Sequence, residues 1–481
     1  MPRVTRVHER ASGYHSPVTT ALAIVLACYL IVLFVVSLWA NRQVQNEADY
    51  IVAGRRLPFS LSTATLLATW FGAGTLMTAT DEIRASGLKA AALEPYGAGL
   101  CLVIGGIFVA RRLWESEVYT VSDVINVSYG PASEVLSVVL AVPGYIGWLG
   151  IQLVALAGIL HVTLDIPMTV GIIGVATVSL AYTLLGGMWS VTITDAIQML
   201  FIVLGVLWLG YVVIDALGSG DLVAGVSELG DKLPADTTAL IPRESFTELM
   251  GWVDVLMISM LGNLPSQELA QRIMASQSAH TAQRACIVSG VLYMVLGTVP
   301  VLLGLAAQLL LPEDDKTAIL QHLALRYLSP AMVILFALSI FSVVMSTLTS
   351  GLLAPATILA QNLVRKLVPE SVSSLTLCRY CVLGILLCSV LVALFGENAY
   401  SMLEASYGIG LVGLFVPFAA GIYGLRASDR AAFTAMMVGT AIWALQFVWD
   451  TDLPLNLLAA LSCALVLFAT RIAERQRELA A

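Results

Sequence analysis

A row of hydroxyl side chains lies inside an apolar stretch that carries no charge, FALSIFSVVMSTLTSGLLAPATILAQN. On a helix, Ser346, Thr349 and Ser350 share one face through their i, i+3, i+4 spacing, and Thr347 lies beside them. Hydroxyl and carbonyl oxygens are ligands that a small hard cation accepts, and they add no formal charge to an apolar span. An isolated Ser or Thr usually bonds to its own helix, but four in five positions indicate a cation site.

Two acidic residues stand alone in long apolar stretches. Asp195 is the only charged side chain between Ile166 and Ile214, and Glu94 is the only one in 90–110. An ionisable group within a membrane span is costly and is functional by default. Asp195 is therefore a candidate ion ligand or proton carrier, with a position at the membrane interface as the alternative, since it lies about five residues into its span. Glu94 lies near the start of its span, so a position at the membrane interface is an equal alternative to a role in ligand binding.

Two apolar stretches are interrupted by residues that break helices. Gly72-Ala73-Gly74 lies within LLATWFGAGTLMTAT, and Gly262, Asn263 and Pro265 lie within SMLGNLPSQELAQR. A broken helix survives in a membrane only where protein or a water-filled cavity surrounds it. Matching breaks in two halves of a chain point to a transporter's binding site, whereas close packing through small residues is the alternative.

The composition identifies the class of protein that holds these residues. Of 481 residues, 58% are hydrophobic and 12% are charged, against about 25% charged in soluble domains. A spanning helix needs roughly 20 apolar residues, and such runs recur along the whole sequence. We therefore predict an all-α polytopic membrane protein with a single membrane domain over 1–481. The thirteen predicted spans are 18–40, 59–80, 90–110, 133–162, 166–185, 190–214, 249–275, 281–311, 330–364, 374–395, 402–424, 431–449 and 453–471.

The distribution of Lys and Arg predicts the orientation of these spans. With the N-terminus outside, the inner loops and the C-terminal tail hold fifteen basic residues and the outer loops hold six. Arg3, Arg6 and Arg10 in the N-terminal tail are the exception. The distribution favours a cytoplasmic C-terminus in a plasma or inner membrane. Segments 216–248 and 312–328 are then outer loops, the second with a short amphipathic helix.

At these residues the chain resembles the sodium/solute symporter family, which has the LeuT-type fold. The stretches that carry the resemblance are LLATWFGAGTLMTAT, AYTLLGGMWSVTITDAIQM, WVDVLMISMLGNLPSQELAQR and SVVMSTLTSGLLAPATILAQN. Within the family, ATWFGAG and the block around Pro265 are most similar to the high-affinity choline transporter branch. The resemblance implies an inverted repeat of five plus five helices, in which the first helix of each repeat, 59–80 and 249–275, is broken. The repeats are 57–214 and 249–424, preceded by an extra helix at 18–40 and followed by two helices in 431–471.

The resemblance also implies two sodium sites. The first uses backbone oxygens of Ala68, Phe71 and Val343 and the hydroxyls of Ser346 and Thr347. The second uses a carboxylate and further hydroxyls, and its ligands are Asp195, Ser346, Thr349 and Ser350.

The solute is expected near both breaks. Trp70 and Trp148 match aromatic residues that enclose the solute in the choline branch, but Ser266 stands where that branch has an aromatic residue. A cage that lacks one wall should bind quaternary ammonium poorly, so both a choline-like cation and an amino acid are candidates. The predicted solute-binding residues are Trp70, Gly72, Thr75, Glu94, Trp148, Asn263 and Gln267.

These observations predict a sodium-coupled symporter that imports a small polar organic solute by alternating access. A solute sensor with little flux and a proton-coupled symporter with Asp195 as the carrier are the alternatives. No spacing of Cys or His fits a metal centre, and no nucleophile–base pair lies in the spans, so neither an enzyme nor a cofactor is expected. The expected partners are the solute, Na+ and the lipid bilayer, without nucleic acid, and a monomer is the simplest arrangement.

Overall fold

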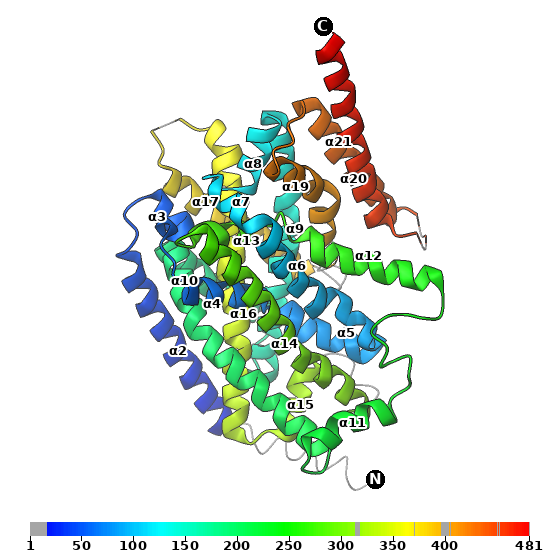
Figure 1. The fold of residues 1–481 in the computed structure, drawn as a ribbon. Helices are drawn as coiled ribbons and strands as arrows, with labels where there is room; N and C mark the ends of the chain where they lie inside the picture. Colours follow the sequence, from blue (N-terminus) through cyan, green and yellow to red (C-terminus); the bar gives the residue numbers. More distant parts are fainter. Residues whose placement is uncertain are drawn as a thin grey trace.

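The computed structural model describes residues 17–312, 318–369, 371–395, 404, 406–449, 451 and 453–480. Within these residues the chain is helical, and its one isolated β-bridge joins Leu57 to Ser276 (Figure 1). The N-terminal tail with Arg3, Arg6 and Arg10 lies outside the described residues.

The segment predicted as the first repeat contains the broken helix that the sequence predicts. α4 (Phe59–Trp70) is separated from η2 (Gly74–Thr78) and α5 (Ala79–Ser86) by three residues, Phe71–Ala73. The other elements between residues 17 and 232 are α2 (Pro17–Asn41), α3 (Glu47–Val52), η1 (Ala53–Arg55), η3 (Leu88–Ala92), η4 (Leu93–Gly97), α6 (Ala98–Ile104), η5 (Gly105–Val109), α7 (Ala110–Glu115), α8 (Val121–Ser128), α9 (Pro131–Leu164), α10 (Met168–Leu217) and α11 (Leu222–Lys232).

The segment predicted as the second repeat also contains its predicted break. α12 (Phe246–Gly262) and α13 (Gln267–Ala275) meet at an angle of 41°. The remaining elements are α14 (Ala279–Leu310), α15 (Ile319–Tyr327), α16 (Pro330–Ile358), η6 (Leu359–Leu363), η7 (Val364–Lys366), α17 (Ser374–Phe395), η8 (Gly410–Phe415), α19 (Val416–Ile422), α20 (Asp429–Ala444), η9 (Leu445–Phe447) and α21 (Leu455–Ala480).

The two predicted spans 166–185 and 190–214 form one kinked helix, α10. Its kink is at Gly187, whose φ of +51° lies in the region that favours glycine. A side chain at this position would also lie 2.5 Å from the backbone oxygen of Tyr50. Gly187 therefore bends the chain between the two spans.

Eight helices among the described residues are long and apolar enough to cross a membrane, or nine if the bent pair α12–α13 counts as one span. Two shorter apolar helices, Met168–Ala181 and Ser406–Ile422, lie outside this count. The count is below the thirteen spans predicted because breaks and kinks divide some apolar runs into pieces, and because α20 has only 16 residues.

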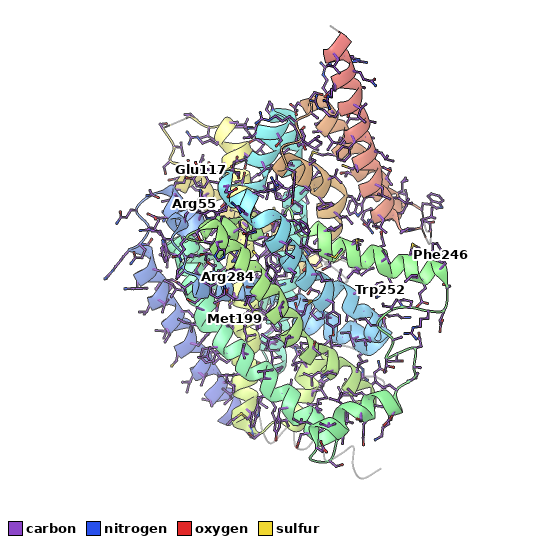
Figure 2. All side chains as sticks on the ribbon, in the orientation of Figure 1. Arg55, Glu117, Met199, Phe246, Trp252 and Arg284 are labelled. Atoms are coloured by element: carbon purple, nitrogen blue, oxygen red, sulfur yellow. The ribbon has the colours of Figure 1, made fainter. Side chains whose placement is uncertain are left out.

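Side chains extend outward all around the helices (Figure 2), and many of the exposed ones are large and apolar. Large exposed apolar side chains recur on the outward faces of α2, α10, α14, α17 and α21, and include Ile24, Ile31, Val35, Leu200, Leu204, Trp208, Val288, Val295, Leu387, Leu391, Leu461 and Leu465. A soluble protein would have to cover so large an apolar surface. Lipid is the solvent that suits it.

The ends of the molecule differ in the elements they carry. α3 and the C-terminal end of α21 lie at one end, and α11 and α15 lie at the other (Figure 1). The predicted short helix in 312–328 is confirmed as α15, and the segment 216–248 contains α11. We refer below to the end with α3 and α8 as the α8 end.

The elements that hold the candidate site lie at the centre of the bundle. Every residue of α16 from 336 to 358 is buried, and it packs against α4, α9 and α10. The start of α4 is joined to the end of α13, since the Leu57 N–H donates to the Ala275 oxygen at 3.0 Å and the Gln277 N–H donates to the Leu57 oxygen at 2.9 Å. The two broken helices are therefore tied together on the α8 end of their breaks.

Candidate ion and solute sites

The break after α4 changes the backbone hydrogen bonding of its last turn. In a continuous helix, the N–H groups of Gly72 and Ala73 would donate to the oxygens of Ala68 and Thr69. Instead the Gly72 N–H donates to the Trp70 oxygen at 2.9 Å, and the Ala73 N–H donates to the Gln152 side-chain oxygen at 3.0 Å. The oxygens of Ala68 and Thr69 are thereby released from helical bonding at a buried position.

Two hydroxyls of α16 reach these oxygens. Ser346 donates to the Ala68 oxygen at 3.0 Å, and Thr347 lies 3.5 Å from the Thr69 oxygen. Both hydroxyls also contact the Val343 oxygen, at 2.8 Å and 3.0 Å. The structure thus brings together four of the five residues predicted for the first sodium site.

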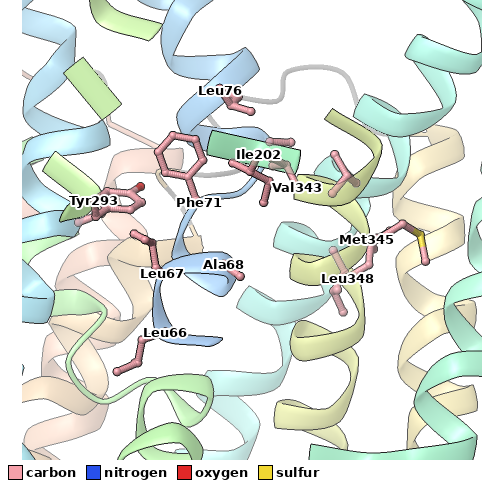
Figure 3. Close-up of a cluster of buried hydrophobic side chains, with 14 of the residues drawn as sticks. Leu66, Leu67, Ala68, Phe71, Leu76, Ile202, Tyr293, Val343, Met345 and Leu348 are labelled. Atoms are coloured by element: carbon pink, nitrogen blue, oxygen red, sulfur yellow. The ribbon is translucent and has the colours of Figure 1, made fainter. Parts of the chain in front are cut away.

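Phe71, the fifth predicted residue, is fully buried beside this cluster. Its ring packs edge-on against Tyr293 with centroids 5.6 Å apart (Figure 3). Leu67, Leu76 and Leu348 complete the apolar surround (Figure 3). Backbone oxygens of an unwound segment, together with nearby hydroxyls, are oxygen ligands that suit Na+. The apolar side chains around them keep water away from these oxygens.

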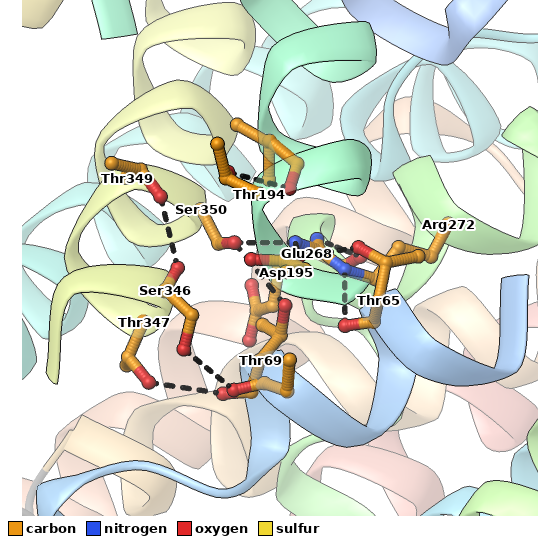
Figure 4. Close-up of polar contacts among 12 residues, drawn as sticks. Thr65, Thr69, Thr194, Asp195, Glu268, Arg272, Ser346, Thr347, Thr349 and Ser350 are labelled. Atoms are coloured by element: carbon orange, nitrogen blue, oxygen red, sulfur yellow. Dashed lines mark hydrogen bonds and ion pairs between the residues drawn. The ribbon is translucent and has the colours of Figure 1, made fainter. Parts of the chain in front are cut away.

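The second predicted site holds an ion pair that the sequence did not suggest. The Asp195 carboxylate is completely buried, and its Oδ2 accepts a hydrogen bond from Thr65 at 2.6 Å (Figure 4). The guanidinium of Arg272 lies 3.7 Å from the same oxygen and donates to Ser350 at 2.5 Å. Asp195 Oδ1 has no hydrogen-bond partner among the described residues. The carboxylate is therefore only partly satisfied.

The hydroxyls predicted for this second site differ in their contacts. The Ser350 hydroxyl, besides contacting Arg272, lies 3.2 Å from the Thr69 hydroxyl. The hydroxyl of Thr349 instead bonds to its own helix, at 3.1 Å from the oxygens of Met345 and Ser346 (Figure 4). Ser350 and Asp195 are brought together through Arg272, and Thr349 is turned away from them.

Arg272 is the largest change from the sequence interpretation, which counted it among the basic residues of an inner loop. Its side chain is 1% exposed, and it also donates to the backbone oxygens of Thr65 at 3.2 Å and Glu268 at 3.0 Å. The spacing of Glu268 and Arg272, one helical turn apart directly after the break, is the sequence signal that could have identified it.

A cavity of about 50 Å³ lies between α9, the break of α12–α13 and the segment 406–414. Of the predicted solute-binding residues, Trp148 and Asn263 line it. The sequence interpretation missed three further residues in its wall, Tyr145, Glu268 and Tyr407.

Glu94 and Thr75 lie directly behind this wall. Tyr407 donates to one oxygen of Glu94 at 3.0 Å, while Tyr293 and Thr75 donate to the other, Thr75 at 3.2 Å. Glu94 is 3% exposed and is therefore buried in the protein. This burial places Glu94 against protein side chains, and its role in solute binding stays a prediction.

The other predicted solute-binding residues lie outside the cavity wall. The Gln267 side chain donates to the Tyr119 oxygen and accepts from the Val121 N–H, both at 2.9 Å, so it holds α8 against α13. Gly72 faces Thr347, and Trp70 packs at the edge of the apolar core. For these three residues a role in solute binding stays a prediction.

Gln152 is a further residue that the sequence analysis missed. Its side-chain oxygen accepts from the Ala73 N–H, and its buried Nε2 has no partner among the described residues. A polar group left unpaired in an apolar environment is costly. Gln152 therefore has a donor available beside the break that follows α4.

Comparisons with known proteins agree with this arrangement. Residues 50–439 match the description "SSF: Sodium:solute symporter family". A high-affinity choline transporter of Drosophila melanogaster is 28% identical over 364 residues, which are 72% of this chain and 57% of the relative. The human high affinity choline transporter is 26% identical over 362 residues, which are 71% of this chain and 61% of the relative. The chain therefore matches less than two thirds of the length of these relatives.

A solved structure shows the same fold over almost the whole chain. A substrate-bound, outward-open Na+-coupled sialic acid symporter superposes with a TM-score of 0.79 at 19% identity, and the match covers 95% of this chain and 98% of that one. The predicted LeuT-type fold is confirmed. The family match covers well over half of the sequence, and this chain belongs to the sodium:solute symporter family.

Proposed function

We propose that the protein is a Na+-coupled symporter that imports a small polar organic solute across a plasma or inner membrane. The observation that carries the proposal is the pair of oxygens at Ala68 and Thr69, released by the helix break and faced by the hydroxyls of Ser346 and Thr347. A cation bound there would link α4 to α16. Its binding would therefore change how the two helices move relative to each other.

The proposed transport cycle follows from this link between α4 and α16. Na+ holds the broken helix against α16 and so shapes the cavity between the breaks. Rocking of one bundle of helices against the rest of the protein then exposes the ion and the solute to the opposite side of the membrane. One charge moving across 100 mV contributes roughly 2.3 kcal/mol, so two Na+ ions would support steep accumulation of solute.

We propose the second Na+ site beside Asp195. The support is its unpaired Oδ1 and the nearby hydroxyls of Thr65 and Ser350. Since Arg272 already contacts both Asp195 and Ser350, an ion would share these groups with the guanidinium. The Hill coefficient of Na+-dependent uptake should fall from about two towards one in Asp195→Asn.

The solute candidates remain a choline-like cation and an amino acid. The relatives named for choline support the cation, as do the aromatic rings of Tyr145, Trp148 and Tyr407 in or beside the cavity wall. Trp148 and Tyr145 contact each other edge-on with centroids 6.3 Å apart.

Uptake into proteoliposomes separates the proposed function from its alternatives. A symporter accumulates solute when a Na+ gradient is imposed, and the accumulation disappears with K+ in place of Na+. A sensor binds solute without accumulating it. A proton-coupled symporter, with Asp195 as carrier, accumulates solute on a pH gradient without Na+. Either of the last two results would overturn Na+ coupling.

A further inference from the structure

We infer that the solute is a small ammonium cation that still carries N–H groups, and that Glu268 is its counter-ion. The inference rests on the proposed function, because it treats the cavity between the breaks as the solute site. It narrows the candidates to primary, secondary or tertiary ammonium and disfavours both quaternary ammonium and solutes with a carboxylate.

The first argument is the balance of buried charge. Asp195, Glu268 and Glu94 are three buried carboxylates near the two breaks, and Arg272 is the buried cation that lies with them. Arg272 pairs with Asp195 and donates to the backbone oxygen of Glu268, not to its carboxylate. No ion pair among the described residues includes the carboxylate of Glu268 or Glu94. A buried charge without a partner is costly, and a cationic solute would supply one.

The second argument is the position of Glu268 on its helix. It is the second residue of α13, in the first turn after the break. In transporters of this architecture, the exposed start of a half-helix attracts anionic groups of the solute. Here the protein's own carboxylate occupies the first turn of α13. A solute carboxylate would meet a like charge there, which disfavours an amino acid.

The third argument is the direction of the hydrogen bonds in the cavity wall. The Tyr145 hydroxyl donates to Glu268, and the Tyr407 hydroxyl donates to Glu94. Asn263 uses a side-chain N–H on the Ser259 oxygen at 3.1 Å. The hydrogens of both tyrosines and one N–H of Asn263 are thus used within the protein, and the wall offers the solute three acceptors: the Glu268 carboxylate, the Asn263 side-chain oxygen and the Tyr407 oxygen. The second N–H of Asn263 and the Ser266 hydroxyl, which has no partner among the described residues, remain as donors.

An acceptor-rich, aromatic and negatively charged wall suits a ligand that is both a cation and a donor. A protonated amine has both properties, and its charge can also lie against the faces of Trp148 and Tyr407. A quaternary ammonium keeps the charge but has no N–H to donate. It would therefore leave the acceptors of the wall without hydrogen bonds.

A series of amines that share a hydroxyethyl group and differ in N-methylation tests this inference. Ethanolamine, N-methylethanolamine, N,N-dimethylethanolamine and choline keep the charge and the hydroxyethyl group while N–H groups are lost one at a time. Their affinities for the purified protein in Na+ would be measured by thermal shift, with ethylene glycol as the neutral control. We expect choline to bind at least tenfold more weakly than ethanolamine and ethylene glycol not to bind. Choline binding as tightly as ethanolamine would overturn the inference.

Glu268 is tested in the same assay by two substitutions. Glu268→Gln removes the charge and should weaken ethanolamine binding at least tenfold, whereas Glu268→Asp keeps the charge and should retain part of it. The rise in Tm caused by Na+ alone should persist in both variants, which shows that they are folded and bind the ion. Unchanged ethanolamine affinity in Glu268→Gln would contradict the assignment.

The same data distinguish failure of the inference from failure of the proposed function. If Na+ stabilises the protein but no amine of the series binds, the inference fails and the Na+ symporter proposal stands. If neither Na+ stabilisation nor Na+-driven uptake of any solute is found, the proposed function itself fails.

Discussion

The hydroxyl oxygen of Ser346 lies 3.0 Å from the backbone oxygen of Ala68, and this contact joins the middle of α16 to the last turn of α4. The contact exists because the Gly72 N–H, the normal helical partner of the Ala68 oxygen, donates to Trp70 instead. One local break in the sequence thus creates an acceptor, and a helix that lies more than 270 residues away supplies the hydroxyl.

Gly72→Ala should weaken Na+ binding through Thr347. A Cβ at Gly72 would lie 3.1 Å from the Thr347 hydroxyl oxygen and 3.3 Å from its methyl group, so Thr347 must move. We expect the Na+ concentration that gives half-maximal stabilisation to rise about tenfold, or about 1.4 kcal/mol. The double variant Gly72→Ala with Thr347→Ser should recover part of the affinity, because it keeps the hydroxyl and removes the methyl group.

The control for this prediction is Gly158→Ala on α9, where a Cβ would meet no atom within 4 Å. It should leave Na+ affinity unchanged. If Gly72→Ala behaves like Gly158→Ala, the contact between Gly72 and Thr347 has no part in ion binding.

Asp195 and Arg272 should behave as a coupled pair in stability measurements. Asp195→Asn leaves a buried guanidinium without its counter-charge, which costs roughly 3–5 kcal/mol. The double variant Asp195→Asn with Arg272→Met removes both charges and should be more stable than Asp195→Asn alone. The Tm values of the four proteins in Na+-free buffer measure the coupling. Additive losses would mean that the two side chains are energetically independent at their separation of 3.7 Å.

The hydrogen bonds between α13 and α16 should keep these two helices together at the α8 end of the molecule. Gln271, the neighbour of Arg272 on α13, donates to Thr357 at 3.1 Å, two turns after Ser350 on α16. Gln271→Leu removes this bond, so we expect faster amide hydrogen exchange in α13 and in the last turns of α16.

Gln308→Leu is a matched substitution at the other end of the molecule. Gln308 donates to the backbone oxygens of Ile83 and Arg84 at 3.3 Å and 2.9 Å, away from α13. It should leave exchange in α13 unchanged. Equal effects of the two substitutions would show that the Gln271 contact does not close the α8 end in particular.

Features that alter the composition of an apolar run could be predicted from the sequence. The hydroxyls of α16, the isolated Asp195 and the two breaks are each unusual within their own stretch, so local patterns predicted a membrane protein with a cation site. The LeuT-type fold and the ligands of the first ion site were implied by the resemblance to the family. The break itself lies one residue earlier than predicted, at Phe71–Ala73. The kink at Gly187 lies between the two spans predicted on either side of it.

The cavity wall could not be predicted in the same way. Tyr145 and Glu268 are 123 residues apart, and their contact depends on how α9 crosses the second break. The sequence analysis counted Arg272 with the basic residues of the inner side, although it lies near the end of the predicted span 249–275. Its burial depends on partners from three other helices, Thr65, Asp195 and Ser350. Such contacts are set by tertiary packing and leave little trace in a local pattern.

The central claim is that Na+ binds between α4 and α16, and a pair of matched variants tests it most directly. Ser346→Ala removes the hydroxyl that faces Ala68, whereas Ser342→Ala removes a buried hydroxyl one turn earlier that bonds to Tyr29 at 2.8 Å. The measurement is the Tm of each purified protein in Na+ and in K+ at equal ionic strength. A ligand at 100 times its Kd stabilises the folded state by about 2.7 kcal/mol. The account predicts a Na+-specific rise in Tm that persists in Ser342→Ala and is largely lost in Ser346→Ala. An equal rise in both variants, or no difference between Na+ and K+ in the unmodified protein, would contradict it.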